Sequence, residues 1–302
     1  MQVLNRILLG LGSDFPDDTI FKYTTTESKL TTWDINPSVA YKLFDKLVIA
    51  VGFRAIYADV SLKQMIPLQT FGLPDGGQTF KATGTGYGWN FGATYSPIDV
   101  LAFGASYRSP VDIDLNGDVS FDLTQNNTPL LTTIFPTTAA VSGINLPGQL
   151  FLGIAYKPSR SWVFEIATRF EQYSSYEKLE VTTRLPVAGQ TSRTINKDWH
   201  DVWAYMFGVS YQIDEGYRFS AGYLYEENPV PDRTYEPAAS GQDKHTLTVG
   251  VAKRFTNITG RVSYAYDFYK DREISNNGTS SLLNGNYSQK NQMVALTLSW
   301  HI

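Results

Sequence analysis

His200, His245 and His301 are the only histidines in this 302-residue sequence, and they are the first residues to consider for catalysis. His200 precedes Asp201, and such a pair is half of a hydrolytic site when a serine nucleophile accompanies it. No serine is paired with these two residues by pattern, and the histidines lack the spacing of metal ligands. The sequence contains no cysteine, which excludes thiolate chemistry. We expect no catalytic residue, metal or cofactor, and we place His200 at a strand end.

A second group of residues that could do chemistry consists of isolated charges within segments of small residues. Unpaired charges in a protein interior are costly, so such side chains usually form ion pairs, although they could also select ions or contact a ligand. Period-two alternation places four of them on the same face as Gly, Ala, Ser and Thr, opposite an apolar face. We predict that these four side chains face an interior lumen: Arg54, Glu165, Arg169 and Arg218.

The segments that carry these charges alternate strictly between large apolar residues and small or polar ones. In segment 202–211, Trp203, Tyr205 and Phe207 share one face, and Ala204, Met206 and Gly208 share the other. This period of two is typical of β-strands with two different faces. The same pattern occurs at 86–95, 100–108, 217–226, 245–255 and 261–270, and in the C-terminal segment 292–302.

The composition indicates which of the two faces points outward. Only 18 % of the residues are charged, against roughly 25 % in ordinary soluble domains. So few charges cannot cover the exterior of a soluble sandwich, whereas an aromatic exterior and a small or polar interior are typical of a transmembrane β-barrel. No run of 18 apolar residues indicates a membrane-spanning helix, and the net charge of −4 gives no reason to expect a nucleic-acid partner.

The connections between the strands support the same fold class. Short turns rich in Pro, Asp, Asn, Gly and Ser fall at 44–46, 96–99, 157–160, 213–216 and 256–259. Long polar links fall between them at 64–83, 120–145, 182–196, 227–243 and 271–288. Short periplasmic turns alternate with long extracellular loops in outer-membrane barrels. We predict an all-β antiparallel barrel of eleven strands, with residues 3–12 as a partial twelfth: 28–43, 47–63, 84–95, 99–119, 146–157, 161–181, 197–212, 217–226, 244–255, 260–270 and 289–302.

Several of these segments resemble the FadL/TodX-type outer-membrane transporters of long-chain fatty acids and other hydrophobic compounds. The resemblance covers most of residues 14–302 in collinear order. Its more distinctive pieces are YRS at 107–109, LP at 146–147 and NPVPDRT at 228–234. It implies a fourteen-stranded barrel with an N-terminal hatch in its lumen. In this family, the ligand is captured between extracellular loops, moves to an internal site and leaves sideways into the membrane.

The start of this sequence departs from the family pattern. The hatch and the first two strands have no counterpart, and MQVLNRILLGLGSD is a poor signal peptide. We therefore expect residues 1–302 to form a single outer-membrane barrel domain that is N-terminally truncated relative to the family.

The resemblance implies passive uptake of hydrophobic compounds, such as fatty acids or aromatic hydrocarbons, across the outer membrane of a Gram-negative bacterium. The expected partners are this ligand and outer-membrane lipids, and the expected state is a monomer. Because cations bind carboxylates, Lys63, Arg193 and Lys197 are candidate ligand contacts near the family's basic residues, although Gln64 and Ile195 occupy the closest matches.

Apolar loop residues could line a greasy groove or simply pack on one another, and we select Met65, Phe71 and Phe135 as candidate ligand contacts. Two alternatives to hydrophobic uptake stay open at this stage. One is a general porin for small polar solutes, and the other is an outer-membrane hydrolase that uses His200.

Overall fold

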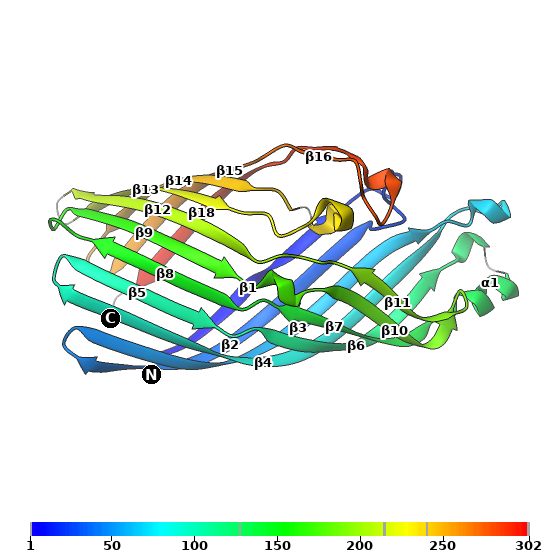
Figure 1. The fold of residues 1–302 in the computed structure, drawn as a ribbon, viewed down its shortest axis with the longest axis horizontal. Coiled ribbons are helices and arrows are strands. Elements are labelled where there is room, and N and C mark those ends of the chain that lie inside the picture. Colours follow the sequence, from blue (N-terminus) through cyan, green and yellow to red (C-terminus); the bar gives the residue numbers. More distant parts are fainter. Residues whose placement is uncertain (1, 127, 214–215, 240, 301–302) are drawn as a thin grey trace.

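The computed structural model describes residues 2–126, 128–213, 216–239 and 241–300, and most of them belong to one antiparallel sheet coiled into an elongated barrel wall (Figure 1). The sheet contains sixteen strands. Their bounds are β1 Gln2–Asp14, β2 Glu27–Phe44, β3 Leu47–Ile66, β4 Gly76–Ile98, β5 Leu101–Arg108, β6 Val111–Asp122, β7 Thr138–Leu146, β8 Gln149–Tyr156, β9 Trp162–Glu171, β10 Lys178–Val187, β11 Gln190–Asn196, β12 Val202–Ile213, β13 Tyr217–Glu226, β14 Lys244–Arg254, β15 Ile258–Tyr269 and β18 Lys290–Trp300.

Short elements in the loops complete the fold. A separate two-stranded sheet pairs β16 (Arg272–Ile274) with β17 (Gly285–Tyr287). The one α-helix in the described residues is α1 (Pro129–Ile134), whose first turn is capped by the Thr128 hydroxyl. No helix in the described residues is long and apolar enough to cross a membrane. The 3-10 helices are η1 Gln69–Phe71, η2 Thr124–Asn126, η3 Tyr173–Ser175, η4 Asp232–Thr234, η5 Pro237–Ala239 and η6 Ser281–Leu283.

The sixteen strands occupy twelve positions around the wall, because four positions each hold two consecutive strands. β5 and β6 share one position, because the long strand β4 pairs with β5 over one half of its length and with β6 over the other. In the same way β7 and β8 share the next position, β9 and β10 the one after it, and β11 and β12 the fourth. The interruptions lie at Ser109–Pro110, Pro147–Gly148, 172–177 and 197–201. Proline cannot donate to a ladder, which explains two of these breaks. The result confirms the predicted fold class, and β1 supplies the twelfth strand expected at 3–12.

Aromatic and aliphatic side chains cover the outer face of the wall. Trp89 and Tyr107 contact each other across β4 and β5 with ring centroids 5.3 Å apart, and Phe53 stacks on Tyr87 at 5.9 Å. Phe53, Tyr87 and Trp89 remain exposed, as does Leu296 on β18 at 78 % of its surface. A continuous exposed apolar surface of this kind is stable in lipid and not in water.

The inner face of β3, β4, β6 and β7 forms an apolar cluster at the end of the barrel that carries the long loops. Ile56, Ile113 and Leu115 are at most 1 % exposed there. Gly86 has no side chain, and a Cβ atom at that position would lie 2.6 Å from Val111 and 2.7 Å from Ile113. Glycine therefore lets β6 pack closely over β4, which narrows this half of the interior.

The structure corrects the predicted loop lengths at three places. The predicted link 182–196 is wrong, because β10 and β11 form a hairpin with a tight turn at Ala188–Gly189, where both φ angles are positive. Residues 76–83 belong to β4, and 138–145 belong to β7. At this end of the barrel the apolar side chains Phe80, Ala82 and Ala140 point inward, so the outward aromatic pattern that marks the other strands does not extend into these segments, although the ladder continues.

The two ends of the sheet are β1 and β18. β1 pairs with β2, and β18 pairs with β15 from Lys290 to Trp300. In the described part of the chain, no backbone pairing joins β1 to β18. His301 and Ile302, which the sequence pattern places in the closing strand, lie outside the described residues.

Candidate functional site: the mouth and the lumen

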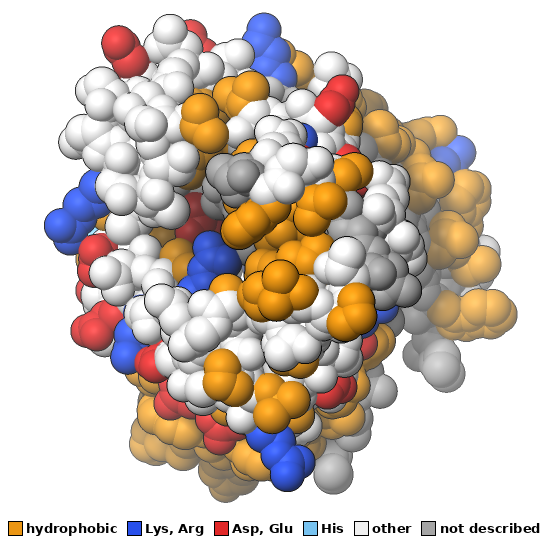
Figure 2. Space-filling view, turned by 90° about the vertical axis from the view of Figure 1, so that its right-hand side faces the viewer, with side chains coloured by type: hydrophobic (Ala, Val, Ile, Leu, Met, Phe, Trp, Pro, Cys, Tyr) orange, Lys and Arg blue, Asp and Glu red, His pale blue; other side chains and the backbone are white. Residues whose placement is uncertain are grey.

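The barrel carries its long loops at one end, and this end has a central hollow. Figure 2 shows apolar side chains along one side of the hollow and both cationic and anionic side chains within it. The predicted site residues lie around this mouth and along the inner wall. Their contacts decide what the hollow can bind.

Arg54 lies on the inner face of β3, opposite the outward-pointing Phe53. Its Nη2 and Nε atoms donate to Asp34 Oδ2 on β2 at 2.8 and 3.1 Å, and both side chains are buried. Asn90 donates to Asn36 at 2.8 Å beside this pair. Arg54 is therefore held in a buried ion pair with Asp34, whose other oxygen, Oδ1, is buried without a protein partner.

Arg169 is the centre of a second charge network on the inner wall. Its Nη2 atom lies 2.6 Å from Glu226 on β13 and 3.1 Å from Glu171 on β9. Lys244 on β14 also reaches Glu226 at 3.4 Å, and Gln149 donates to Glu171 at 2.6 Å. Two cations and two carboxylates from β9, β13 and β14 therefore neutralise one another.

Glu165 and Arg218 lie closer to the short turns. Glu165 is exposed and alternates with the outward-facing Phe164 and Ile166 along β9. Arg218 is exposed on β13 and donates to Gln212 at 2.8 Å. The structure therefore does not bring these two predicted residues into the networks of Arg54 and Arg169.

The predicted basic contacts at the mouth divide into two kinds. Lys63 on β3 lies 2.7 Å from Glu27 on β2, and this hydrogen bond raises the pKa of Lys63 and lowers that of Glu27. Arg193 on β11 is exposed, and its Nη1 atom lies 2.9 Å from the carbonyl oxygen of the Gln64 side chain when that amide is oriented to satisfy its neighbours. Since β3 and β11 are not neighbours in the sheet, this contact crosses the mouth.

Lys197 is buried at the β11–β12 break. Its ammonium lies 2.6 Å from Glu236, with side chains 6 % and 12 % exposed respectively. The Thr234 hydroxyl donates to the Lys197 carbonyl at 2.5 Å. Lys197 thus anchors the loop 227–243 to the barrel wall.

The apolar loop residues mainly pack on one another. Ile66, Leu68, Leu123 and Leu131 form a buried cluster. Phe135 is partly buried against this cluster and lies 5.5 Å from Phe121. Met65 is half-buried, and Phe71 is 71 % exposed at the tip of its loop. Of the three predicted apolar contacts, Phe71 is therefore the one most open to solvent.

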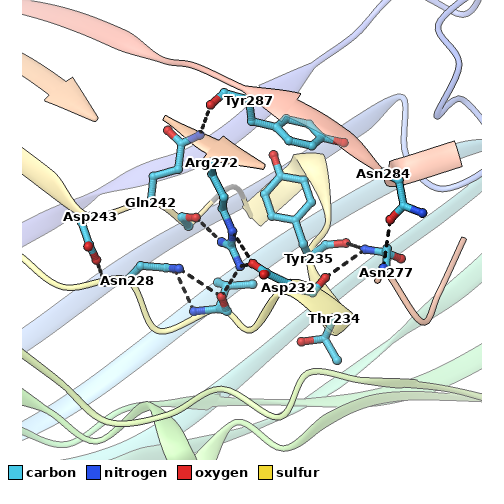
Figure 3. Close-up of polar contacts among 12 residues, drawn as sticks. Asn228, Asp232, Thr234, Tyr235, Gln242, Asp243, Arg272, Asn277, Asn284 and Tyr287 are labelled. Carbon is cyan, nitrogen blue, oxygen red and sulfur yellow. Dashed lines mark hydrogen bonds and ion pairs between the residues drawn. The ribbon is translucent and has the colours of Figure 1, made fainter. Parts of the chain in front are cut away.

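A polar network that no sequence pattern indicated holds the loops together (Figure 3). Arg272 Nε and Nη2 donate to Asp232 at 2.8 and 2.6 Å, and Nη2 also donates to the Val230 carbonyl at 2.6 Å. Its guanidinium donates to the Gly241 carbonyl and lies over the Tyr235 ring at 5.1 Å. Loops 227–243 and 271–288 thus form one cap, and no local signal in either loop predicts their pairing.

The two histidines within the described residues, His200 and His245, make structural contacts. His200 is exposed at the β11–β12 break, and its backbone N–H donates to the Pro229 carbonyl. The neighbouring Asp201 accepts a hydrogen bond from the Ser174 backbone at 2.9 Å. His245 lies 2.7 Å from the Tyr223 hydroxyl and stacks on Phe268 at 5.2 Å. Within the described residues, no group of three or more His, Cys, Asp or Glu could hold a metal ion.

An all-β antiparallel wall with an apolar aromatic exterior and an ion-paired interior defines a β-barrel of the bacterial outer membrane. The sequence matches the outer membrane protein transport protein family (OMPP1/FadL/TodX) over residues 7–302, and the chain belongs to this family.

Two curated relatives illustrate the range of this similarity. The long-chain fatty acid transport protein of Escherichia coli K12 is 25 % identical over 292 residues, which cover 85 % of this chain and 65 % of that protein. Outer membrane protein P1 of Haemophilus influenzae is 22 % identical over 296 residues, with coverages of 86 % and 61 %. The chain therefore spans about two thirds of the length of these relatives.

Solved structures show the same fold. A Pseudomonas aeruginosa FadL homologue superposes with a TM-score of 0.81 at 16 % identity, covering 97 % of this chain and 71 % of that one. The Pseudomonas putida toluene transporter TodX gives 0.69 at 16 % identity, with coverages of 96 % and 76 %.

Proposed function

We propose that this protein is a passive outer-membrane channel for the uptake of hydrophobic compounds such as long-chain fatty acids or aromatic hydrocarbons. The observation that carries this proposal is a depression of about 390 Å³ in the wall of β3, β4, β5, β8 and β9. Its lining residues include Val48, Ala50, Gly104, Phe151 and Gly153, and none of them is charged. Each Å² of apolar ligand surface that is removed from water in this depression favours binding by roughly 25 cal/mol.

The names of the relatives agree with this proposal. The E. coli relative is a long-chain fatty acid transport protein, and the P. putida structure is a toluene transporter. Passive uptake requires no covalent step, so we propose that the protein is not an enzyme. It acts as a monomer surrounded by outer-membrane lipids.

The alternative is a general porin for small polar solutes. A porin needs a water-filled passage lined by polar groups that remain available to the solute. The ion pairs of Arg54 and Arg169 and the apolar packing of Leu68 and Leu131 favour hydrophobic uptake instead.

Two measurements on the purified protein distinguish these functions. In liposome swelling assays with small sugars, we expect rates no higher than those of protein-free vesicles. In equilibrium binding, monitored through tryptophan fluorescence, we expect toluene or a long-chain alcohol to bind saturably. Rapid swelling together with an absence of hydrophobic binding would establish the porin and refute the proposal.

A further inference from the structure

Three lysines at the mouth of the barrel, Lys22, Lys63 and Lys197, are already paired with carboxylates. Lys63 lies 2.7 Å from Glu27, which also accepts a hydrogen bond from the Ser61 hydroxyl at 2.8 Å. Lys22, in the loop after β1, lies 2.9 Å from Asp75. A carboxylate that approached either lysine would meet a pair without net charge and would have to displace or share the existing partner.

Lys197 is still less available to an incoming anion. Its ammonium is 6 % exposed and is held 2.6 Å from Glu236. Addition of a second carboxylate would place two negative charges against one positive charge in a buried position. Such an arrangement is unfavourable because desolvated like charges repel strongly.

The arginines deeper in the lumen are likewise paired with carboxylates. Arg54 is committed to Asp34, and Arg169 is shared between Glu171 and Glu226. Two carboxylates within reach of Arg169 leave this part of the wall no excess of positive charge, even with Lys244 beside Glu226.

The depression in the lumen wall offers apolar contact and little else. Its polar side chains are the hydroxyls of Thr94 and Ser106, beside Phe151, Val48 and several glycines and alanines. These two hydroxyls can hydrogen-bond to a single hydroxyl group of a ligand, or can lie beside an uncharged ligand without a bond. The cation beside the depression is Arg169, whose guanidinium lies 5.8 Å from the centre of the Phe151 ring and is already held by Glu171 and Glu226. Burial of an ionised carboxylate there would therefore be costly.

We infer that the molecule this channel accepts is an uncharged hydrophobic compound, such as a hydrocarbon or a long-chain alcohol, and not a carboxylate. The inference rests on the proposed function and narrows its substrate class. Arg193 is the basic residue that most needs a test, because it contacts the Gln64 amide rather than a carboxylate.

The test compares probes that differ only in their polar end. Binding of oleyl alcohol and oleate, and of toluene and benzoate, is measured at pH 8 with the purified full chain. We expect the uncharged member of each pair to bind at least tenfold more tightly. Glu27→Gln removes the carboxylate beside Lys63 and should bring the oleate affinity to within threefold of that for the alcohol.

Glu180→Gln is the matched control for Glu27→Gln. Glu180 pairs with Lys178 at 2.8 Å, and both residues alternate with the inward-facing Val181, so they lie on the outer face of the hairpin. This variant should leave all four affinities unchanged. An oleate affinity equal to that of oleyl alcohol in the wild-type protein, lost in Arg193→Gln, would overturn the inference while leaving hydrophobic uptake intact. Failure of every probe to bind would refute the proposed function itself.

Discussion

The ammonium of Lys197 and the carboxylate of Glu236 lie 2.6 Å apart and join the barrel wall to the extracellular cap. The two residues are 39 positions apart in the sequence. The Thr234 hydroxyl adds a second contact to the Lys197 carbonyl. The cap is therefore fixed to the wall at the level where β11 ends.

Removal of one member of this buried pair should loosen the cap. Lys197→Met leaves Glu236 buried without its cation, which costs about 3–5 kcal/mol. We expect faster hydrogen exchange in residues 228–239, while amides in β13 and β14 stay protected. The double variant Lys197→Met/Glu236→Leu should restore most of the protection, because an apolar pair needs no counter-charge. Unchanged exchange in the single variant would contradict this role.

Arg272 should be the residue on which the pairing of the two cap loops depends. It donates to Asp232 and to the carbonyls of Val230 and Gly241 (Figure 3). Arg272→Lys keeps the charge but loses the planar fork, so we expect it to restore little of what Arg272→Ala loses. Limited proteolysis of loops 227–243 and 271–288 measures this effect. Equal resistance of wild type and Arg272→Ala would refute it.

The direction of side chains on β18 predicts a strong difference between two neighbouring positions. Leu296 pairs with the outward-facing Val262, and Thr297 points to the other face of the strand. Leu296→Arg should destabilise insertion by about 2–4 kcal/mol near the bilayer midplane, whereas Thr297→Arg should cost much less. Urea titration of folding into phospholipid vesicles compares the two variants. Similar losses would place both side chains on the lipid face.

Two tyrosines in the cap should resist ionisation. Burial raises the pKa of Tyr235 above its ordinary value, and burial also raises that of Tyr287. The rings lie 4.4 Å apart. Because the folded-state pKa values are raised, the neutral phenols contribute stability that is present below the unfolded-state pKa near 10 and is lost as the pH rises further. Ultraviolet titration of wild type and Tyr235→Phe measures how many tyrosines ionise near pH 10. We expect the same number in both, because Tyr235 does not ionise there in the wild type. A missing transition there would contradict the prediction.

Much of the barrel wall could be predicted from the sequence, because lipid on one side and a lumen on the other impose a period of two. That pattern predicted β13, β14 and β15 closely and placed Arg54 and Arg169 on the face opposite the aromatic residues. It did not reveal the start of β4, the strand β7 or the β10–β11 hairpin. Towards the loop end the apolar side chains of β4 and β7, such as Phe80 and Ala140, point inward, so the outward aromatic pattern does not mark these strands.

The sequence by itself determined the class of fold, the direction of side chains within the apolar band and the short turns. The tertiary structure alone decided which charges meet, and so which cations the mouth can offer to a ligand. Lys63 pairs with Glu27, Lys197 pairs with Glu236 and Arg272 pairs with Asp232 across 36 to 40 residues. Strand alternation is a local property that any segment carries within itself. An ion pair between distant segments depends on the curvature and register of the whole wall, which no local pattern contains.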